Sequence, residues 1–170
     1  MRLKTSLGAI IGAVFIVIAA TMPSAAAAPP TDACPLLTQA EVSAVVGVSV
    51  GAGSHITPTY LKSCTWAPPG GATVQFASVL LALEPAASWE SAKAMLQSVA
   101  NSPSAKKGGV TMTPASGIGD DALYSSVGNY TKLAVKKGDV SFQIVISSNA
   151  PIEKKRDMEK ALAAKVLAKL

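Results

Sequence analysis

The residue best suited to acid–base chemistry at neutral pH is His55, the only histidine among the 170 residues of the chain. Ser54 and Thr57 lie beside it and carry hydroxyl groups, so a Ser–His–acid site is one arrangement to consider. Glycine and proline flank this stretch, which is typical of a solvated surface loop. We therefore predict that His55 takes no part in catalysis and that the chain has no catalytic residue.

The other reactive groups are Cys34 and Cys64, the only two cysteines. They present three possibilities: a reactive thiol pair, a pair of metal ligands or a disulfide. One histidine and two distant cysteines fall short of the four ligands of a structural zinc site. An even number of cysteines in an exported chain favours pairing. We predict a Cys34–Cys64 disulfide, no metal and no other cofactor; closing a loop of about 30 residues contributes roughly 3–4 kcal/mol in the chain-entropy model.

A pair of acids, Asp120 and Asp121, follows Gly117 and Gly119. A dinucleotide-binding loop would need a third glycine within a parallel strand–helix–strand unit. A calcium loop would need alternating acids and a distal glutamate. Adjacent residues on a strand point to opposite faces, so the pair is badly placed for joint acid–base work. We predict a tight turn whose carboxylates cap backbone amides.

Charge and aromatic residues indicate where binding would occur. The formal net charge is +5, the basic clusters are short, and the signatures of nucleic-acid-binding folds are absent from the sequence, so we expect no nucleic-acid partner. The candidate binding surface consists of Tyr60, Tyr124, Tyr130, Lys136 and Lys137. The expected partner is a protein, or a small apolar or anionic ligand of the cell envelope.

The N-terminus has the layout of a secretory signal peptide, predicted here as residues 1–27. Basic residues precede an apolar run of about 16 residues, and small residues suited to a signal peptidase follow. An uncleaved anchor is one alternative, although the run is short for a span of about 20 residues. A lipoprotein is another, but Cys34 comes late for lipidation. We expect a flexible lead at 28–32, a single domain at 33–170, secretion or residence in the cell envelope, and no stable membrane insertion after cleavage.

Helix signals occur in three places. Thr38 and Glu41 have the spacing of a capping box at the start of a helix that Gly47 can end. Ser88 is predicted to cap a second helix, and Pro151 suits the first turn of a third. The apolar face of the second helix would consist of Trp89, Ala92, Met95, Leu96 and Val99. That of the third would consist of Met158, Ala161, Leu162, Lys165, Val166 and Leu170.

Alternating or continuous apolar residues predict strands between these helices. Their ranges are 63–66, 72–83, 110–113, 122–127, 130–136 and 140–146. Cys64 and Trp66 would share one face of the first strand, and Gly128 and Asn129 sit at a two-residue hairpin turn. The order is helix, strands, helix, strands, helix. This pattern predicts an α+β fold, in which helices pack on one face of an antiparallel sheet and one disulfide locks the domain.

Several short motifs together carry a resemblance to a known group of proteins. They are Cys34-x-Leu-Leu-Thr-x-Ala-Glu-Val, Cys64-x-Trp66, Gly117-Ile-Gly-Asp-Asp-Ala122, and Lys137-Gly-Asp139 before an apolar strand. In these motifs the chain resembles a family of small bacterial secreted proteins and lipoproteins, best populated in actinobacteria. The resemblance implies a disulfide, a mixed fold of helices and strands, and an envelope or extracellular location. It implies no catalytic residue, because the family has no agreed activity.

These observations favour a secreted, non-catalytic binding or interaction module of the bacterial cell envelope or exterior. The shortage of positioned acids, bases and nucleophiles is the main reason. One alternative is an inhibitor of a secreted enzyme, which differs only in its partner. The other is a hydrolase-like enzyme, which would require His55 and Asp120 to converge in one cleft.

Overall fold

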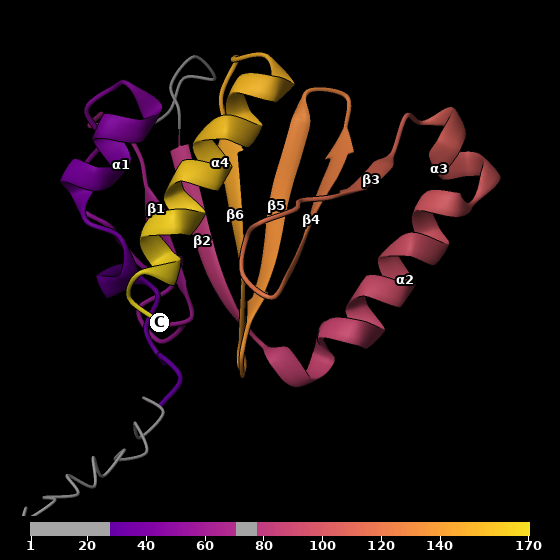
Figure 1. The fold of residues 1–170 in the computed structure, drawn as a ribbon. Helices are drawn as coiled ribbons and strands as arrows, with labels where there is room; N and C mark the ends of the chain where they lie inside the picture. The colour runs from indigo at the N-terminus through magenta and orange to yellow at the C-terminus, as the bar shows by residue number, and fades with distance from the viewer. Residues whose placement is uncertain (1–27, 71–77) are drawn as a thin grey trace, which may run out of the picture.

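The computed structural model describes residues 28–70 and 78–170, so the predicted signal peptide and the first part of the predicted strand 72–83 lie outside the described residues. Figure 1 shows a sheet with helices on its front and at its sides. The elements in chain order are η1 (Cys34–Leu36), α1 (Gln39–Val46), β1 (Ser63–Trp66), β2 (Ser78–Pro85), η2 (Ala86–Ser88), α2 (Trp89–Asn101), α3 (Pro103–Lys107), β3 (Thr111–Pro114), β4 (Asp121–Val127), β5 (Tyr130–Lys137), β6 (Val140–Ser147) and α4 (Ile152–Leu167).

Within the described residues the strands form one six-stranded sheet in the order β1-β2-β6-β5-β4-β3. Every neighbouring pair is antiparallel, and β3 to β6 follow one another as a meander. Gly128 and Gly138 have φ angles of 54° and 55° in its two tight turns, a backbone region that favours glycine. The predicted α+β class, with an antiparallel sheet, helices and one disulfide, is confirmed.

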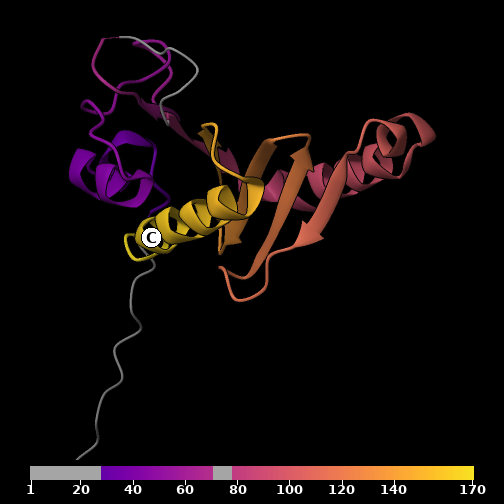
Figure 2. The ribbon, with the colours of Figure 1, turned by 90° about the horizontal axis from the view of Figure 1, so that it is seen from above.

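Strand alternation divides the sheet into two unlike faces. One face carries Leu81, Leu133 and Ile144, which are fully buried and lie side by side across β2, β5 and β6. Helix α4 packs on this face against β5 and β6, and α1 packs beside α4. Figure 2 shows both helices on the same side of the sheet. The hydrophobic core therefore lies between the sheet and these two helices.

Helix α1 begins and ends as the sequence predicts. The Thr38 hydroxyl accepts a hydrogen bond from the Glu41 amide at 3.2 Å, and the Glu41 carboxylate accepts one from the Thr38 amide at 2.8 Å. The Thr38 amide, followed by the Lys169 ammonium, holds the pKa of Glu41 at about 2. Gly47 ends the helix with a φ of 76°. The capping box and the contact with Lys169 therefore fix α1 beside the C-terminal end of the chain.

Thr38→Ala should lower the free energy of unfolding by about 1 kcal/mol, because it leaves the Glu41 amide without its side-chain acceptor. Urea-induced unfolding at neutral pH measures this difference. Thr57→Ala is the matched control, since Thr57 is exposed in a loop, and its effect should stay within about 0.5 kcal/mol. Equal effects of the two changes would contradict the role given to the cap.

Helix α2 departs from the sequence prediction in two ways. Ser88 makes no side-chain capping bond, because its hydroxyl donates to the Pro85 carbonyl at 2.8 Å instead. Of the predicted apolar face only Trp89 is buried, whereas Met95 and Val99 are exposed. The reason is the path of the helix, which runs away from the sheet along its β3 edge (Figure 2). Its first turns are bonded to the sheet, because the Trp89 indole and the Lys93 ammonium both donate to the Asp121 carboxylate.

Candidate functional site

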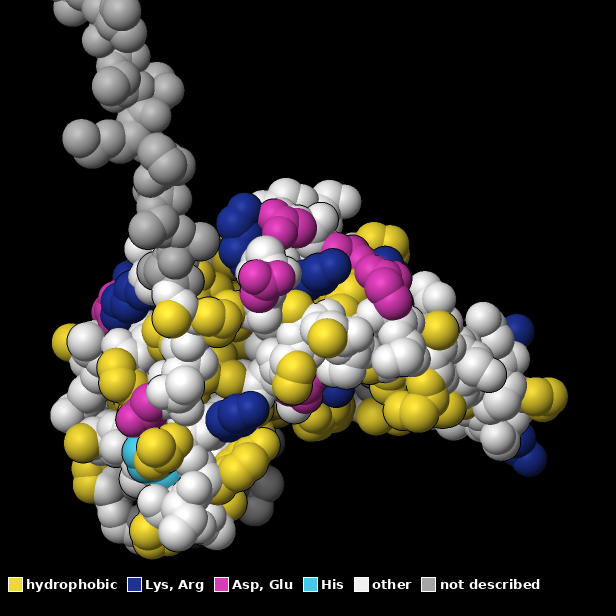
Figure 3. Space-filling view, turned by 90° about the horizontal axis from the view of Figure 1, so that it is seen from below, with side chains coloured by type: hydrophobic (Ala, Val, Ile, Leu, Met, Phe, Trp, Pro, Cys, Tyr) yellow, Lys and Arg dark blue, Asp and Glu magenta, His cyan; other side chains and the backbone are white. Residues whose placement is uncertain are grey.

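The second face of the sheet, opposite α1 and α4, is the candidate functional site, and we call it the open face. Its members come from the three adjacent strands β2, β6 and β5, and strand register places them side by side. They are Leu80, Ala82, Gln143, Val145, Tyr130, Lys132 and Ala134. In Figure 3 the molecule is hollowed between the lobe that carries His55, in cyan, and the projecting arm of α2 and α3. In the view of Figure 1 the open face is the rear side of the sheet, facing away from the viewer.

The floor of the open face is apolar and its middle is made of small side chains. Ala82 and Ala134 flank Gln143 in one row across the sheet, and Leu80 and Lys132 flank Val145 in the next. Ala82 and Val145 in its middle are buried, at 8% and 7% exposed, and the residues beside them are partly exposed. Helix α2 borders this floor over β3 and β4 rather than covering it. A partner would therefore contact the partly exposed side chains around the buried middle.

The charges on this side of the sheet favour an acidic partner. Glu84 accepts a hydrogen bond from Gln143 at 2.8 Å, and Asp121 is paired with Lys93. Lys132 and Lys136 form no ion pair with a carboxylate of the residues that the structure describes. The acids on this face are thus engaged, while two ammonium groups remain available.

The two predicted tyrosines that flank the β4–β5 hairpin lie on opposite faces. Tyr124 pairs with Leu133 and faces α4, where its hydroxyl donates to the Arg156 carbonyl at 3.1 Å. The Arg156 guanidinium lies 5.1 Å from the centre of the Tyr124 ring, a cation–π contact. Tyr130 pairs with Val127 on the open face, and both are exposed. Tyr130 therefore belongs to the candidate site, and Tyr124 to the packing of α4.

The remaining predicted binding residues are dispersed. Tyr60 is exposed in the loop before β1, at the edge of the sheet. Lys136 is on the open face, but Lys137 is on the other side of β5, where its ammonium lies 2.8 Å from the Asp120 carboxylate. Tyr130 and Lys136 lie near opposite ends of β5. The five residues predicted as a binding surface thus do not form one patch.

The structure places Asp120 in the turn before β4 and Asp121 at the first position of β4, so the predicted turn contains only the first of the two acids. The Asp120 carboxylate accepts from the Gly138 amide at 2.7 Å and from the Lys137 ammonium at 2.8 Å, and these bonds lower its pKa. Gly119 has a φ of 60°, and a side chain there would collide with the Lys136 carbonyl. Asp121 accepts from the Trp89 indole at 2.9 Å and holds α2 to the sheet. Both acids act as structural acceptors.

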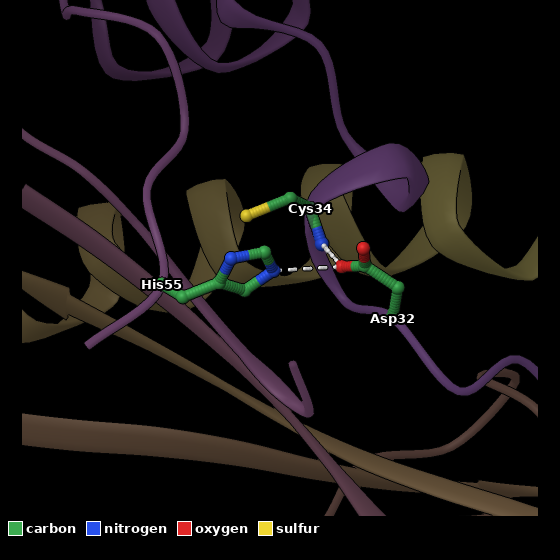
Figure 4. A group of neighbouring side chains, drawn as sticks. All are labelled: Asp32, Cys34 and His55. Carbon is green, nitrogen blue, oxygen red and sulfur yellow. Dashed lines mark hydrogen bonds and ion pairs between the residues drawn. The ribbon is translucent and has the colours of Figure 1, made fainter. Parts of the chain in front are cut away.

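His55 and its neighbours form the second cluster of polar groups. The His55 Nε2 atom lies 2.9 Å from the Asp32 carboxylate, which also accepts from the Cys34 amide at 2.9 Å (Figure 4). The His55 bond, the largest cause, and the Cys34 amide lower the pKa of Asp32. The disulfide predicted between Cys34 and Cys64 is formed. His55 and Asp120 have separate partners, so the structure does not bring these two residues together as a catalytic pair.

Sequence reasoning missed one pattern, at residues 47–51, which read Gly-Val-Ser-Val-Gly. This is the Gly-x-Ser-x-Gly spacing of a nucleophile elbow, which requires a sharp turn from a strand into a helix. Here the order is reversed, because Gly47 is the residue that ends α1. Ser49 is exposed in the loop that follows. The residues match the motif, and their structural setting does not.

Sequence reasoning also missed a buried polar cluster beneath α4. Glu159 and Lys155 are 0% and 2% exposed. Burial raises the pKa of Glu159 to about 8, against weaker opposing effects of the Ile146 amide, the Thr131 hydroxyl and the neighbouring cations. The Lys155 ammonium donates to the Asn129 and Ser148 carbonyls, and burial lowers its pKa. The sequence did contain a signal for this cluster. Lys155 and Glu159 are four residues apart, so they lie on the same side of the helix, next to its apolar residues.

None of the helices built from the described residues is long and apolar enough to cross a membrane. A scan of the sequence against models of known protein families gives no match, and neither does a search of curated proteins. The geometry and charge of the open face are therefore the basis for inferring a function.

Proposed function

We propose that this protein is a secreted, non-catalytic binding module of the bacterial cell envelope or exterior, and that its open face docks a partner protein. The observation that carries the proposal is one sheet with two unlike faces. Helices α1 and α4 pack against one face. The other presents an exposed tyrosine, a partly exposed rim around the buried Ala82 and Val145, and two lysines that form no ion pair among the described residues. The partner would offer an apolar patch surrounded by acidic side chains. An enzyme held by an inhibitor is one partner of this kind.

The dimensions of the sheet support a protein as the partner. A strand spacing of about 4.8 Å and a rise of about 3.3 Å per residue give the three strands of the open face a width of about 14 Å and a length of about 26 Å. This is roughly half of the 800 Å² or so that a standard protein interface covers on each partner, so a docked protein would also contact the lobe and the arm that flank the face. Tyr130 lies exposed on this face, and tyrosine is enriched among the residues that dominate binding energy.

The state of the reactive groups supports a non-catalytic role. His55 is bound to Asp32, and Asp120 to Lys137 and the Gly138 amide. Both cysteines are held in one disulfide, which also supports an oxidising compartment. These groups are used as structural contacts, so we assign function to the exposed face instead.

The experiment compares capture of a partner from a bacterial envelope extract by the wild-type protein and by single variants. Tyr130→Ala should weaken binding by about 2 kcal/mol, close to 30-fold. Lys132→Glu should weaken it further at low salt, because the charge that attracts the acidic partner is reversed. Quantitative mass spectrometry of the captured proteins identifies those whose recovery depends on both residues.

Lys160→Glu is the matched control, since it reverses the same charge at an exposed position on α4. It and His55→Ala should retain the partner that Tyr130→Ala and Lys132→Glu lose. The proposal would be contradicted if the partner is still captured by Tyr130→Ala and Lys132→Glu, or if it is lost in His55→Ala. Binding of a small anionic amphiphile in place of a protein would likewise reject it.

A further inference from the structure

Side chains with metal-binding atoms from three separate segments of the sequence come together beside the first strand. Asp32 and Cys34 come from the segment before α1, His55 from the loop before β1, and Cys64 from β1 itself. One carboxylate oxygen of Asp32, one ring nitrogen of His55 and the Cys34 sulfur lie within 4.8 Å of one another. Figure 4 shows the Cys34 sulfur beside the imidazole, with Asp32 bound on the other side of the ring.

Cys64 joins this group through two independent contacts. Its sulfur is bonded to that of Cys34, and the two Cα atoms are 5.0 Å apart. In addition, Ser54 forms an antiparallel bridge with Thr65, which places His55 opposite Cys64 on the neighbouring strand. Residues directly opposite in such a pair have Cβ atoms about 5 Å apart. The group thus comprises the Cys34 sulfur, one nitrogen and one oxygen within 4.8 Å of one another, and the Cys64 sulfur bonded to that of Cys34.

We propose that reduction of the Cys34–Cys64 disulfide converts this cluster into a Zn²⁺ site, with Cys34, Cys64, His55 and Asp32 as its four ligands. Thiolate, imidazole and carboxylate are the groups that hold Zn²⁺ in proteins, in tetrahedral sets of four. From the sequence alone only the two cysteines and His55 could be recognised as ligands, because nothing in the sequence around Asp32 indicates that it joins them. This site is separate from the open face and does not depend on the proposed function.

Formation of the site requires that the Cys34–Cys64 disulfide is reduced, and a phosphine can serve as the reductant. The disulfide gains two electrons and two protons and becomes two thiols. The phosphine gains an oxygen atom from water and becomes a phosphine oxide. Each thiol then loses its proton as it binds the metal, so binding tightens as the pH rises. In the oxidised protein the sulfurs are bonded to each other, and only His55 and Asp32 remain as ligands.

Three contacts hold the ligands in place before the metal binds. The Cys34 amide donates to the Asp32 carboxylate at 2.9 Å, and the Ala33 amide donates to the Leu61 carbonyl at 2.9 Å. Gly53 lies so close to Cys64 that a side chain at 53 would meet its sulfur at 2.7 Å. The site is therefore enclosed on one side, and the segment that carries two of its ligands is tied to the loop before β1.

The test titrates the exported protein with Zn²⁺ against a chromogenic chelator, without oxygen, before and after reduction by a phosphine. The reduced protein should bind one equivalent, and the oxidised protein should not compete with the chelator. His55→Ala and Asp32→Asn should each weaken binding by at least about 100-fold, since even residues that only support ligands contribute about 10–100-fold. Asp120→Asn, a hydrogen-bonded acid in another turn, is the matched control and should bind as the wild type does.

Circular dichroism shows whether each reduced protein is folded, and Co²⁺ substitution reports which ligands hold the metal. Tetrahedral Co²⁺ with two thiolates gives an intense charge-transfer band, which should appear in the reduced wild type and change in His55→Ala. If the reduced protein binds no metal, the proposal is wrong. It is equally wrong if binding is the same in the wild type, His55→Ala and Asp32→Asn, which is the behaviour of two thiols in an unfolded chain.

Discussion

Trp66→Ala should lower the free energy of unfolding by about 3–5 kcal/mol, the loss typical of a large aromatic side chain removed from a core. Trp66 is 1% exposed and is the largest fully buried side chain of the described residues. Its indole packs against the backbone at Gly53, where an added side chain would meet the ring nitrogen at 2.7 Å. The cavity left by alanine would lie next to the disulfide, where the covalent bond limits collapse.

Urea-induced unfolding of the oxidised protein, followed by circular dichroism, measures this loss. Trp66→Phe keeps most of the buried surface and should cost clearly less than Trp66→Ala. Tyr60→Ala, a change of an exposed aromatic residue in the nearby loop, should stay within about 0.5 kcal/mol. A loss below about 1 kcal/mol in Trp66→Ala would show that this side of the core is not packed as described.

The second large effect is a pH dependence of stability that originates in Glu159. Burial raises the pKa of this carboxyl from its ordinary value of 4.5 to about 8 in the folded protein. A carboxyl whose pKa rises on folding contributes its stability fully below pH 4.5, and that stability is lost as the pH rises to about 8. Each pKa unit corresponds to about 1.4 kcal/mol, so the wild type should lose roughly 3–5 kcal/mol of this contribution over the interval.

Glu159→Gln removes the titration and keeps nearly the same shape. The difference in unfolding free energy between this variant and the wild type should therefore grow from pH 5 to pH 8, in favour of the variant. Glu153→Gln, at an exposed position on the same helix, is the control and should show no such trend. A constant difference between Glu159→Gln and the wild type across this range would show that Glu159 is already ionised in the folded state.

Local signals in the sequence were sufficient for much of this fold. The capping box at Thr38 and Glu41 and the glycine turns at 128 and 138 depend on residues within a few positions of each other. The disulfide needed one further argument, the count of cysteines in a chain predicted to be exported. These features could be predicted because each has a short-range cause or only one possible pairing.

The contacts that decide the candidate sites are long-range. Asp32 and His55 are 23 residues apart, and nothing in either local sequence indicates their pairing. Which of Tyr124 and Tyr130 packs under a helix depends on the side of the sheet that α4 occupies, because alternation assigns residues to faces without saying which face is covered. The exposure of Met95 and Val99 depends on the direction in which α2 leaves the sheet. Periodicity alone could not supply these facts.

Site-specific photocrosslinking in cells that produce the protein tests most directly whether the open face is the docking surface. A photoreactive phenylalanine analogue at position 132 would lie on the open face, and one at position 160 would lie on the exposed side of α4. If the open face docks the partner, we expect a discrete covalent adduct with one partner protein from position 132 and none from position 160. An adduct from position 160 alone, or the same adducts from both positions, would contradict the open face as the docking surface.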